Sequence, residues 1–377
     1  MTSSPSSADV AVRTISSDEH LAYLRSLPSA SFLQTPAWGQ VKSDWTSHSL
    51  GFFAGSVMVG AGLVLLRPIP LLRRFLAYLP EGPTLDWSRD DLPALIQAMA
   101  AHLKTRGAFG IRMGPPVVLR RWEAATIKSA IADPAAHRLS DVRPDERSDL
   151  GARLSSLLER GGWRQQPPAP GFTAGQPRFN FWLPLKGRGE DDVLAGMNQQ
   201  WRRNIKKAAK AGVAVDVGRR EDLPAFHQAY VETAARDGFT PRPLAYFETM
   251  YDALNTEHPN RMRLYLAHHE DVLVAAGTMV RVGEHAWYSY GASTTTHREV
   301  RGSNALQWEM MRAAMAEGAA VYDLRGITDT LDESDPHIGL LQFKVGTGGQ
   351  AVEYVGEWDL PLSPLLYRAF DLYLRRR

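Results

Sequence analysis

Apolar and polar positions alternate along the chain in short blocks that predict strands and helices in turn. A nearly uncharged run over 51–66 contains four glycines and ends at Arg67-Pro68, which predicts two strands joined by a turn. The run is shorter than the roughly 20 apolar residues that a membrane-spanning helix needs. We therefore expect no transmembrane segment.

One succession of elements occurs twice. Each copy has an apolar strand, a helix, a glycine that stops the helix, and a second strand. The copies are 57–66, 90–104, Gly107 and 108–113, and then 272–280, 304–316, Gly318 and 320–324. This pattern predicts a duplicated α/β domain. Any two α/β units would also show it, so the pattern alone leaves both origins open.

A charged, proline-containing segment over 132–150 lacks apolar periodicity and predicts the join between two domains. We expect a helix over 150–160 to begin the second domain, with a strand over 178–185 after it. The C-terminal tail predicts a strand over 352–360 and a short amphipathic helix over 364–374. Strands and helices mix in both halves, which predicts an α/β (α+β) fold.

The composition narrows the classes of function. At 377 residues, the chain is long for one hydrophobic core. Its 43 Lys and Arg balance 41 Asp and Glu, so polyanion binding would need a local patch. The absence of cysteine excludes disulfides and thiolate nucleophiles. Residues 1–9 lack the basic start and apolar stretch of a signal peptide, so we expect a cytoplasmic protein.

Several familiar motifs are absent from the sequence. It contains no Gly-x-x-x-x-Gly-Lys-Ser/Thr phosphate loop, no Gly-x-Ser-x-Gly elbow and no His-Glu-x-x-His. His268-His269 lies at an expected strand end without helical spacing, so we expect no metal site. Hydrolases of these classes and nucleotide-driven ligases are disfavoured.

The segment 201–210 concentrates five cations within ten helix-prone residues, and Gly212 stops the helix. Helical spacing places four of these cations on one side, namely Arg203, Lys206, Lys207 and Lys210. A solvated face and a phosphate-binding face explain the cluster equally well.

The segment Arg301-Gly302-Ser303-Asn304 follows an aromatic strand over 287–291 and precedes a helix. It resembles the acyl-cofactor loop of GNAT-type acetyltransferases, because exposed amides at a helix start bind anions. We prefer the alternative of a capping turn with Ser303 as N-cap.

Near the C-terminus, the strand 322–327 and a polar stretch precede the apolar run 339–346, which delivers Lys344 and is followed by Gly348 and Gly349. A lysine held between an apolar run and glycines suits the stabilisation of a developing negative charge. A structural lysine at a strand end is the alternative.

Five stretches spread over nearly the whole chain are similar, in order, to signatures of the Fem family (FemABX), whose members are tRNA-dependent peptidyltransferases that extend cell-wall precursors. They are Phe32–Lys42, Met197–Gly212, Tyr322–Ile327, Gly339–Gly349 and Glu353–Leu362. The resemblance implies two tandem acetyltransferase-like (GNAT-like) domains, with the tail returning to the first. We therefore predict domains at 10–145 plus 351–377 and at 146–350. The turn at Gly212 leaves no room for the helical arm that some members carry.

The resemblance also implies an activity. We expect transfer of glycine, alanine or serine from aminoacyl-tRNA to an amine of a peptidoglycan precursor stem peptide, which forms the interpeptide bridge. No cofactor is expected, since aminoacyl-tRNA is itself the activated donor. The acceptor would be nucleotide- or lipid-linked, and a lipid-linked one would bring the cytoplasmic protein to the inner face of the membrane. The run 71–76 is a candidate for that peripheral contact, although such a run is more often part of a core.

Site residues follow from the same resemblance. Lys344 is expected to donate to the oxyanion, and Lys42, Arg242 and Tyr246 to bind the acceptor, with the two cations on its diphosphate. Asp323 is the candidate base, but a structural hydrogen bond to the neighbouring loop, or proton relay by the tRNA itself, explains the sequence as well.

Three other functions remain open. One is tRNA-dependent transfer of an amino acid to a peptide natural product. Another is acyl-CoA-dependent N-acetyl transfer, which predicts acetyl-CoA binding at 301–304. The third is a non-catalytic RNA-binding module, which the basic segment alone would satisfy.

Overall fold

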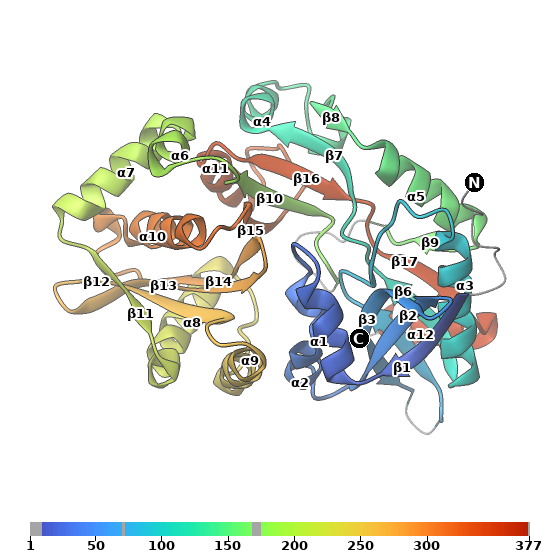
Figure 1. Cartoon of the computed structure of the whole chain (residues 1–377). Coiled ribbons are helices and arrows are strands. Elements are labelled where there is room, and N and C mark those ends of the chain that lie inside the picture. Colours follow the sequence, from blue (N-terminus) through green and yellow to red (C-terminus); the bar gives the residue numbers. More distant parts are fainter. Residues whose placement is uncertain (1–9, 70–71, 168–174, 376–377) are drawn as a thin grey trace. The chain divides into compact units, whose positions relative to one another are not determined.

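The computed structural model describes residues 10–69, 72–167 and 175–375 (Figure 1). Residues 1–9, which lack signal-peptide features, and Leu71 of the run 71–76 lie outside this range. The chain forms two compact units. Unit 1 is Met1–Arg120, Arg147–Arg178 and Glu353–Arg377, and unit 2 is Arg121–Glu146 and Phe179–Val352.

Unit 1 is built on a sheet with strand order β1-β2-β3-β4-β6-β17-β9, and β5 pairs with β3. The strands of this sheet are β1 Val10–Ile15, β2 Thr46–Ala54, β3 Val57–Pro68, β4 Phe75–Leu79, β5 Thr84–Leu85, β6 Ala108–Met113, β9 Arg164–Gln165 and β17 Trp358–Pro361. Its helices are α1 Ser17–Arg25, η1 Phe32–Gln34, α2 Pro36–Val41, α3 Leu92–Thr105, α5 Asp149–Arg160 and α12 Pro364–Arg375. The two strands and turn predicted for 51–66 are confirmed as β2 and β3.

Unit 2 carries most of a second sheet, of order β11-β12-β13-β14-β15-β10-β16-β7-β8. Its strands are β7 Val118–Glu123, β8 Glu146–Arg147, β10 Phe179–Pro184, β11 Ala214–Gly218, β12 Met262–His269, β13 Val272–Val282, β14 His285–Ser293, β15 Val321–Ile327 and β16 Gln350–Tyr354. Its helices are α4 Ala124–Ile131, η2 Leu139–Asp141, α6 Glu190–Gly196, α7 Gln199–Lys210, η3 Arg220–Asp222, α8 Leu223–Asp237, α9 Leu244–Glu257, η4 Arg298–Val300, α10 Gly302–Ala316 and α11 Ile338–Val345.

The two sheets repeat one topology. In each, four strands pair antiparallel in sequence, and the fourth pairs in parallel with the next strand, β4 with β6 in one sheet and β14 with β15 in the other. An antiparallel strand then follows, β17 or β10. A helix, α3 or α10, lies between the strands of each parallel pair and ends before a glycine with positive φ, Gly107 (106°) or Gly318 (77°). This shared order supports the predicted duplication.

The division of the chain differs from the predicted domains. The segment 121–146 belongs to unit 2, because Trp122, Ile127 and Leu139 are buried in the same apolar cluster as α11. Helix α5 belongs to unit 1 instead of starting the second domain, since Leu154 and Leu158 pack in that unit's core. The two segments on either side of the predicted join, 121–146 and α5, therefore each belong to the other unit from the one predicted.

The tail differs in one detail. The strand predicted over 352–360 is two strands, β16 and β17, separated by Gly356 at φ 81°. A residue with that backbone conformation breaks a strand. Residues from Glu353 onward rejoin unit 1, and the last helix α12 packs on β4 and β6 through Phe370.

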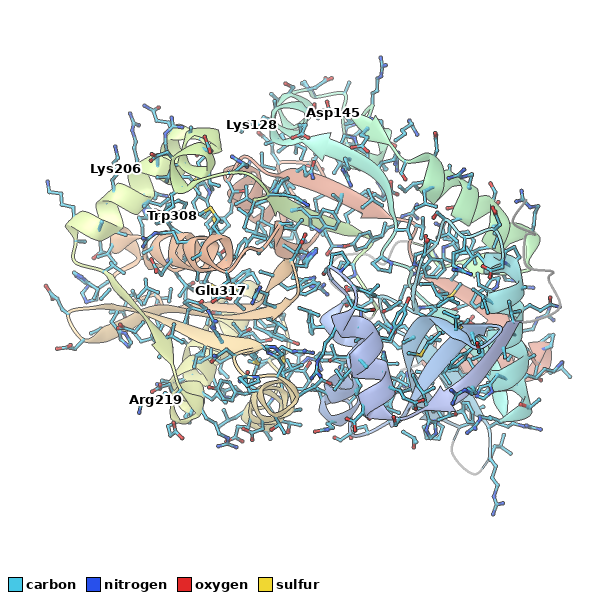
Figure 2. All side chains as sticks on the ribbon, viewed as in Figure 1. Lys128, Asp145, Lys206, Arg219, Trp308 and Glu317 are labelled. Atoms are coloured by element: carbon cyan, nitrogen blue, oxygen red, sulfur yellow. The ribbon has the colours of Figure 1, made fainter. Side chains whose placement is uncertain are left out.

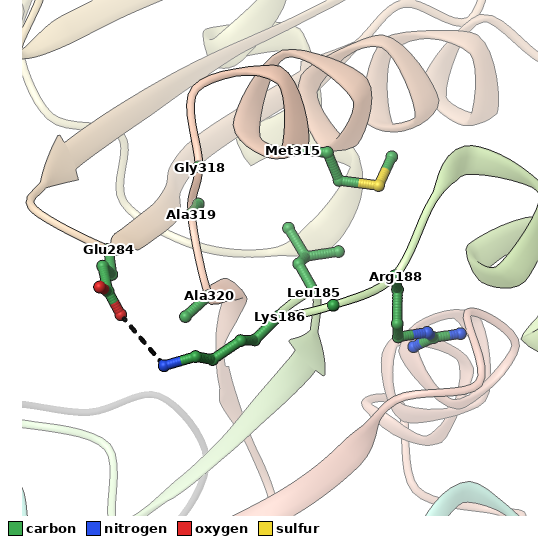
Figure 3. A pocket seen from close by; sticks show the side chains of 9 residues that line it. Leu185, Lys186, Arg188, Glu284, Met315, Gly318, Ala319 and Ala320 are labelled. Carbon is green, nitrogen blue, oxygen red and sulfur yellow. Dashed lines mark ion pairs between the residues drawn. The ribbon is translucent and has the colours of Figure 1, made fainter.

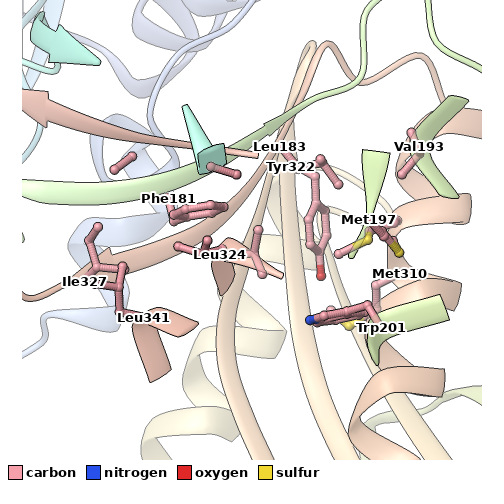
Figure 4. Close-up of a cluster of buried hydrophobic side chains, with 14 of the residues drawn as sticks. Phe181, Leu183, Val193, Met197, Trp201, Met310, Tyr322, Leu324, Ile327 and Leu341 are labelled. Carbon is pink, nitrogen blue, oxygen red and sulfur yellow. The ribbon is translucent and has the colours of Figure 1, made fainter. Parts of the chain in front are cut away.

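Apolar side chains cover both faces of the second sheet. One cluster unites α7, α10 and α11 with β10 and β15, and includes Trp201, Met310 and Tyr322 (Figure 4). The other lies under α8 and α9 and includes Phe226 and Phe247. Functional side chains in this unit are therefore confined to strand ends, helix ends and exposed helix faces.

The predicted absence of a helical arm is confirmed. Helix α7 ends at Lys210, Gly212 has a positive φ of 75°, and β11 begins at Ala214. No helix among the described residues combines the length and the apolarity that crossing a membrane requires.

Candidate functional site

Lys344 lies in the last turn of α11, so the apolar run that delivers it is a helix and not the end of a strand. The residue is buried, with 4% of its surface exposed. Its ammonium group donates to the carbonyl oxygens of Gly326, at 2.6 Å, and Arg325, at 3.3 Å. Both acceptors lie at the carboxyl end of β15. The cation is thus held by backbone dipoles.

Burial lowers the pKa of Lys344 to about 7. The negative charge of Asp323 opposes this shift, and the positive charge of Arg325 adds to it. A lysine with this pKa changes protonation near neutral pH. It can stabilise an oxyanion when protonated and accept a proton when neutral.

Asp323 is fully buried in β15 between β10 and β14. Its Oδ1 accepts the backbone N–H of Arg325 at 2.6 Å. Its Oδ2 accepts the indole N–H of Trp182 at 3.1 Å and faces Nε2 of His285 at 3.3 Å. These contacts are those of the structural alternative named for Asp323, because both oxygens already hold donors of the protein.

The glycines after Lys344 allow close packing of the loop. A Cβ on Gly346 would collide with the indole of Trp201, and one on Gly349 with the carbonyl oxygen of Trp182. Gly348 has φ 79°, and a Cβ there would meet the carbonyl oxygen of Gly196. These glycines, expected from the sequence to serve the chemistry of the lysine, bring the end of α11 against α6, α7 and β10.

We expect Gly348→Ala to destabilise the protein by at least about 2 kcal/mol more than Gly162→Ala. Both glycines have a positive φ near 80°, so both substitutions pay a similar backbone cost of about 1 kcal/mol. Only Gly348 also faces backbone atoms, whereas nothing lies within 4 Å of a Cβ on Gly162. Urea unfolding of the two variants measures the difference, and equal losses would contradict the packing role.

Arg242 and Tyr246 are brought together by the segment before α9. The guanidinium lies over the Tyr246 ring, 4.8 Å from its centroid. The Tyr246 hydroxyl lies 3.1 Å from that of Tyr290 in β14. Burial and the neighbouring Tyr290 raise the pKa of Tyr246 well above its usual value, so the phenol stays neutral. His227 contacts the Arg242 carbonyl oxygen at 3.0 Å and holds the segment in place.

Tyr290 is a candidate that sequence analysis missed. It belongs to the aromatic strand 287–291, but a β-bulge adds Ser289 between Tyr288 and Tyr290, so these two tyrosines point to opposite sides of the sheet. Tyr290 thereby packs in the cluster under α8 and α9. Alternation in the sequence could not reveal the bulge, so this residue had no detectable signal.

Lys42 belongs to unit 1, where it forms the C-cap of α2, and its ammonium lies 5.3 Å from the Trp38 ring centroid. Arg242 and Tyr246 belong to unit 2, as do Lys344 and Asp323. The acceptor residues predicted from the sequence are therefore divided between the two units.

Helix α7 has the predicted two faces. Trp201 is buried, its ring contacts that of Phe343 at 4.7 Å between centroids, and its indole N–H donates to the Phe343 carbonyl oxygen. Arg203, Lys206 and Lys207 are exposed, and Lys206 points outward in Figure 2. Among the described residues, no ion pair is recorded for these three cations. The buried face of α7 thus supports the helix that carries Lys344.

The loop before α10 differs from the prediction. The helix starts at Gly302, and its N-cap is Arg301 at φ 64°, with no side-chain cap. Ser303 is therefore not the N-cap. A Cβ on Gly302 would collide with the Val274 side chain, so close packing on β13 sets the start of the helix.

A surface cavity of about 240 Å³ lies beside the start of β15 (Figure 3). Lys186 and Glu284 approach each other to 4.0 Å at its edge, and Met315 and Ala320 line it. Lys344 contacts the opposite end of that strand, so the cavity contains none of the predicted site residues. Among the described residues, no cluster of three or more His, Cys, Asp or Glu could hold a metal ion.

Two known proteins are similar to this chain along nearly its whole length. Lipid II:glycine glycyltransferase of Staphylococcus aureus (strain USA300) is 23% identical over 426 residues, which span 95% of this chain and 94% of the relative. A crystal structure of FemX matches with a TM-score of 0.79 at 21% identity, covering 95% and 99% of the two chains.

A more distant fold match is the C-terminal domain (DUF2156) of a putative lysylphosphatidylglycerol synthetase from Agrobacterium fabrum, with a TM-score of 0.51 and 12% identity over 95% of this chain and 98% of that one. The fold shared with FemX consists of two tandem GNAT-like domains. The sequence model of the FemAB family matches residues 15–269 and 253–375. The chain therefore belongs to the FemAB family.

Proposed function

We propose that this protein transfers an amino acid from aminoacyl-tRNA to an amine of the stem peptide of a peptidoglycan precursor. The observation that carries the proposal is the match to a lipid II:glycine glycyltransferase along nearly the whole of both chains. Lipid II is a membrane-bound acceptor, so we place the protein in the cytoplasm with a peripheral contact at the inner face of the membrane.

The proposed reaction is attack by the acceptor amine on the ester carbonyl of the charged tRNA. A C–N bond forms, the C–O bond to the terminal ribose breaks, and one proton passes from the amine to the leaving oxygen. Because the ester is already activated, no nucleotide hydrolysis is needed. Alignment of the two substrates can contribute about 7–11 kcal/mol.

In this reaction Lys344 donates to the oxyanion of the tetrahedral intermediate. A single donor of this kind contributes about 2.7–4 kcal/mol. The carbonyl oxygens of Arg325 and Gly326 occupy part of its hydrogen-bonding capacity, and a lysine ammonium has three donors, so one remains for the substrate. Its two backbone partners orient the ammonium before the substrate arrives.

Arg242, Tyr246 and Lys42 bind the acceptor in this proposal. The Arg242 guanidinium, stacked on Tyr246, suits a diphosphate, which both nucleotide- and lipid-linked precursors contain. Tyr290 holds the Tyr246 hydroxyl and joins this group. The donated amino acid is expected to be glycine, alanine or serine.

One experiment tests the proposed function directly. The protein is incubated with mixed charged tRNAs and with lipid- and nucleotide-linked precursors, and the products are weighed by mass spectrometry. We expect one precursor to gain the mass of an amino acid residue only when charged tRNA is present. Transfer that proceeds with acetyl-CoA instead, or no gain with any precursor, would overturn the proposal.

We expect charge reversal at Arg203, Lys206 and Lys207 to weaken tRNA binding and to flatten its salt dependence. Each phosphate contact that is lost removes about one unit from the slope of log affinity against log salt concentration. The three side chains are exposed on one face of α7. Filter binding of charged tRNA at a series of salt concentrations measures the slope.

The matched control reverses three exposed cations elsewhere, Lys128, Arg143 and Arg153, which changes net charge by the same amount. This control is expected to keep most of the slope. If both triple variants lose the same slope, the α7 face contributes only through overall charge.

A further inference from the structure

His285 is a partly buried histidine that the proposed reaction does not use. It is the first residue of β14, and its side chain is 15% exposed. The imidazole stacks on Trp287 at 4.1 Å between ring centroids and meets the Trp182 ring edge-on at 5.4 Å. Its Nε2 faces Oδ2 of Asp323 at 3.3 Å. Two indoles thus fix the direction in which this ring presents its nitrogen.

The contact defines the proton position on the ring. A carboxylate only accepts hydrogen bonds, so in a hydrogen bond with the carboxylate form of Asp323 it is Nε2 of His285 that donates. Trp182 donates to the same oxygen from the neighbouring strand β10. Two donors from two strands therefore hold one oxygen of Asp323, and this leaves the other oxygen directed along β15.

That second oxygen holds a β-bulge inside β15, where Leu324 and Arg325 lie between the pairs Asp323–Trp182 and Gly326–Asn180. Oδ1 of Asp323 accepts the backbone N–H of Arg325 at 2.6 Å, and Arg325 adopts a left-handed conformation at φ 63°. This backbone conformation costs a non-glycine residue free energy, so contacts with its surroundings must hold it there. The hydrogen bond from its N–H to Asp323 is such a constraint. It holds the peptide group between Leu324 and Arg325, directly before the Arg325 carbonyl group.

Carbonyl groups of this bulge hold Lys344. Gly326 and Arg325 accept its ammonium at 2.6 Å and 3.3 Å. A continuous series of contacts thus runs from the imidazole through the carboxylate and the bulge to the ammonium. All of its members belong to unit 2.

We infer that His285 is a positioning residue for Lys344, acting through Asp323 and the β-bulge at Arg325. The inference rests on the proposed function, since it assigns His285 to the same reaction. The imidazole touches neither substrate. Its task is to hold the carboxylate so that the bulge keeps its carbonyl groups directed at the ammonium.

Two substitutions separate the hydrogen bond from the packing. His285→Phe keeps a ring against Trp287 but has no donor, whereas His285→Gln keeps a donor near the position of Nε2. We expect His285→Phe to lower kcat by between about tenfold and a hundredfold, because small displacements of a reacting group have effects of that size. The KM for the precursor is expected to stay within about twofold. His285→Gln is expected to recover most of kcat.

A double-variant cycle tests whether His285 acts through Lys344. In a Lys344→Met background, His285→Phe is expected to have no further effect on kcat, because the group that it positions is missing. An equal loss in both backgrounds would overturn the inference, as would failure of His285→Gln to recover activity while the protein remains folded.

A measurement without catalysis separates this inference from the proposed function. Hydrogen exchange of the Arg325 amide is expected to be at least about tenfold faster in His285→Phe than in the wild type, and close to wild type in His285→Gln. If no precursor is ever modified but these exchange rates hold, the proposed function fails and the positioning contact stands. Unchanged exchange in His285→Phe would overturn the contact itself.

Discussion

Replacing Lys344 by methionine is expected to lower the rate of amino acid transfer by at least about a hundredfold. The loss of one oxyanion donor typically costs about a hundredfold to a thousandfold in kcat. Methionine has nearly the length of lysine and fills the same buried space, so packing around α11 is largely retained. The carbonyl oxygens of Arg325 and Gly326 lose a partner, but a desolvated cation is removed at the same time.

The rate is measured with saturating charged tRNA and precursor, and folding is checked by thermal unfolding. Lys128→Met, at an exposed position of α4, is the matched control and is expected to keep wild-type transfer. Normal turnover by Lys344→Met in a folded protein would remove Lys344 from the reaction. A similar loss in both variants would indicate a general effect of lysine replacement.

The duplicated α/β fold could be predicted because its signals are local. Gly107 and Gly318 each mark the end of a helix, and an apolar strand follows each of them. Both signals lie within one short stretch of sequence. The exchange of 121–146 and of α5 between the units could not be predicted, because it depends on which core buries Trp122 and which buries Leu154. A sequence shows that these residues are apolar but not where they pack.

Some residues of the candidate site could likewise be predicted from the sequence, and others could not. Lys344 and Arg242 are predicted as site residues only from the resemblance to a family, since the residue pattern alone favours a structural role for that lysine. His285 and Tyr290 were missed because their partners, Asp323 and Tyr246, lie 38 and 44 residues away in sequence. Contacts of this kind arise from strand pairing, and in β14 a bulge shifts the alternation that a pattern relies on.

The advantage that Lys344 gives is expected to disappear as the pH rises above about 7. Burial lowers its pKa to about 7, with Asp323 acting against the shift and Arg325 with it. The lysine is therefore protonated below that pH and neutral above it, and a neutral amine is a weak donor to an oxyanion. The acceptor amine needs the opposite protonation state, because it attacks in its neutral form. Its pKa is about 10. Above pH 7 the two effects cancel in the wild type, whose kcat/KM is expected to become constant.

The ratio of wild-type to Lys344→Met rates isolates the lysine, since the acceptor amine affects both proteins equally. We expect this ratio to be constant below pH 7 and to fall about tenfold per pH unit above it, following the fraction of protonated lysine. Single-turnover transfer between pH 5.5 and pH 9 measures the ratio, with the remaining charged tRNA quantified at each pH because its ester hydrolyses in base. A ratio that stays constant to pH 9 would mean that Lys344 keeps its proton throughout. The Asp323 carboxylate would then outweigh burial, and the backbone carbonyl groups would hold a permanent cation.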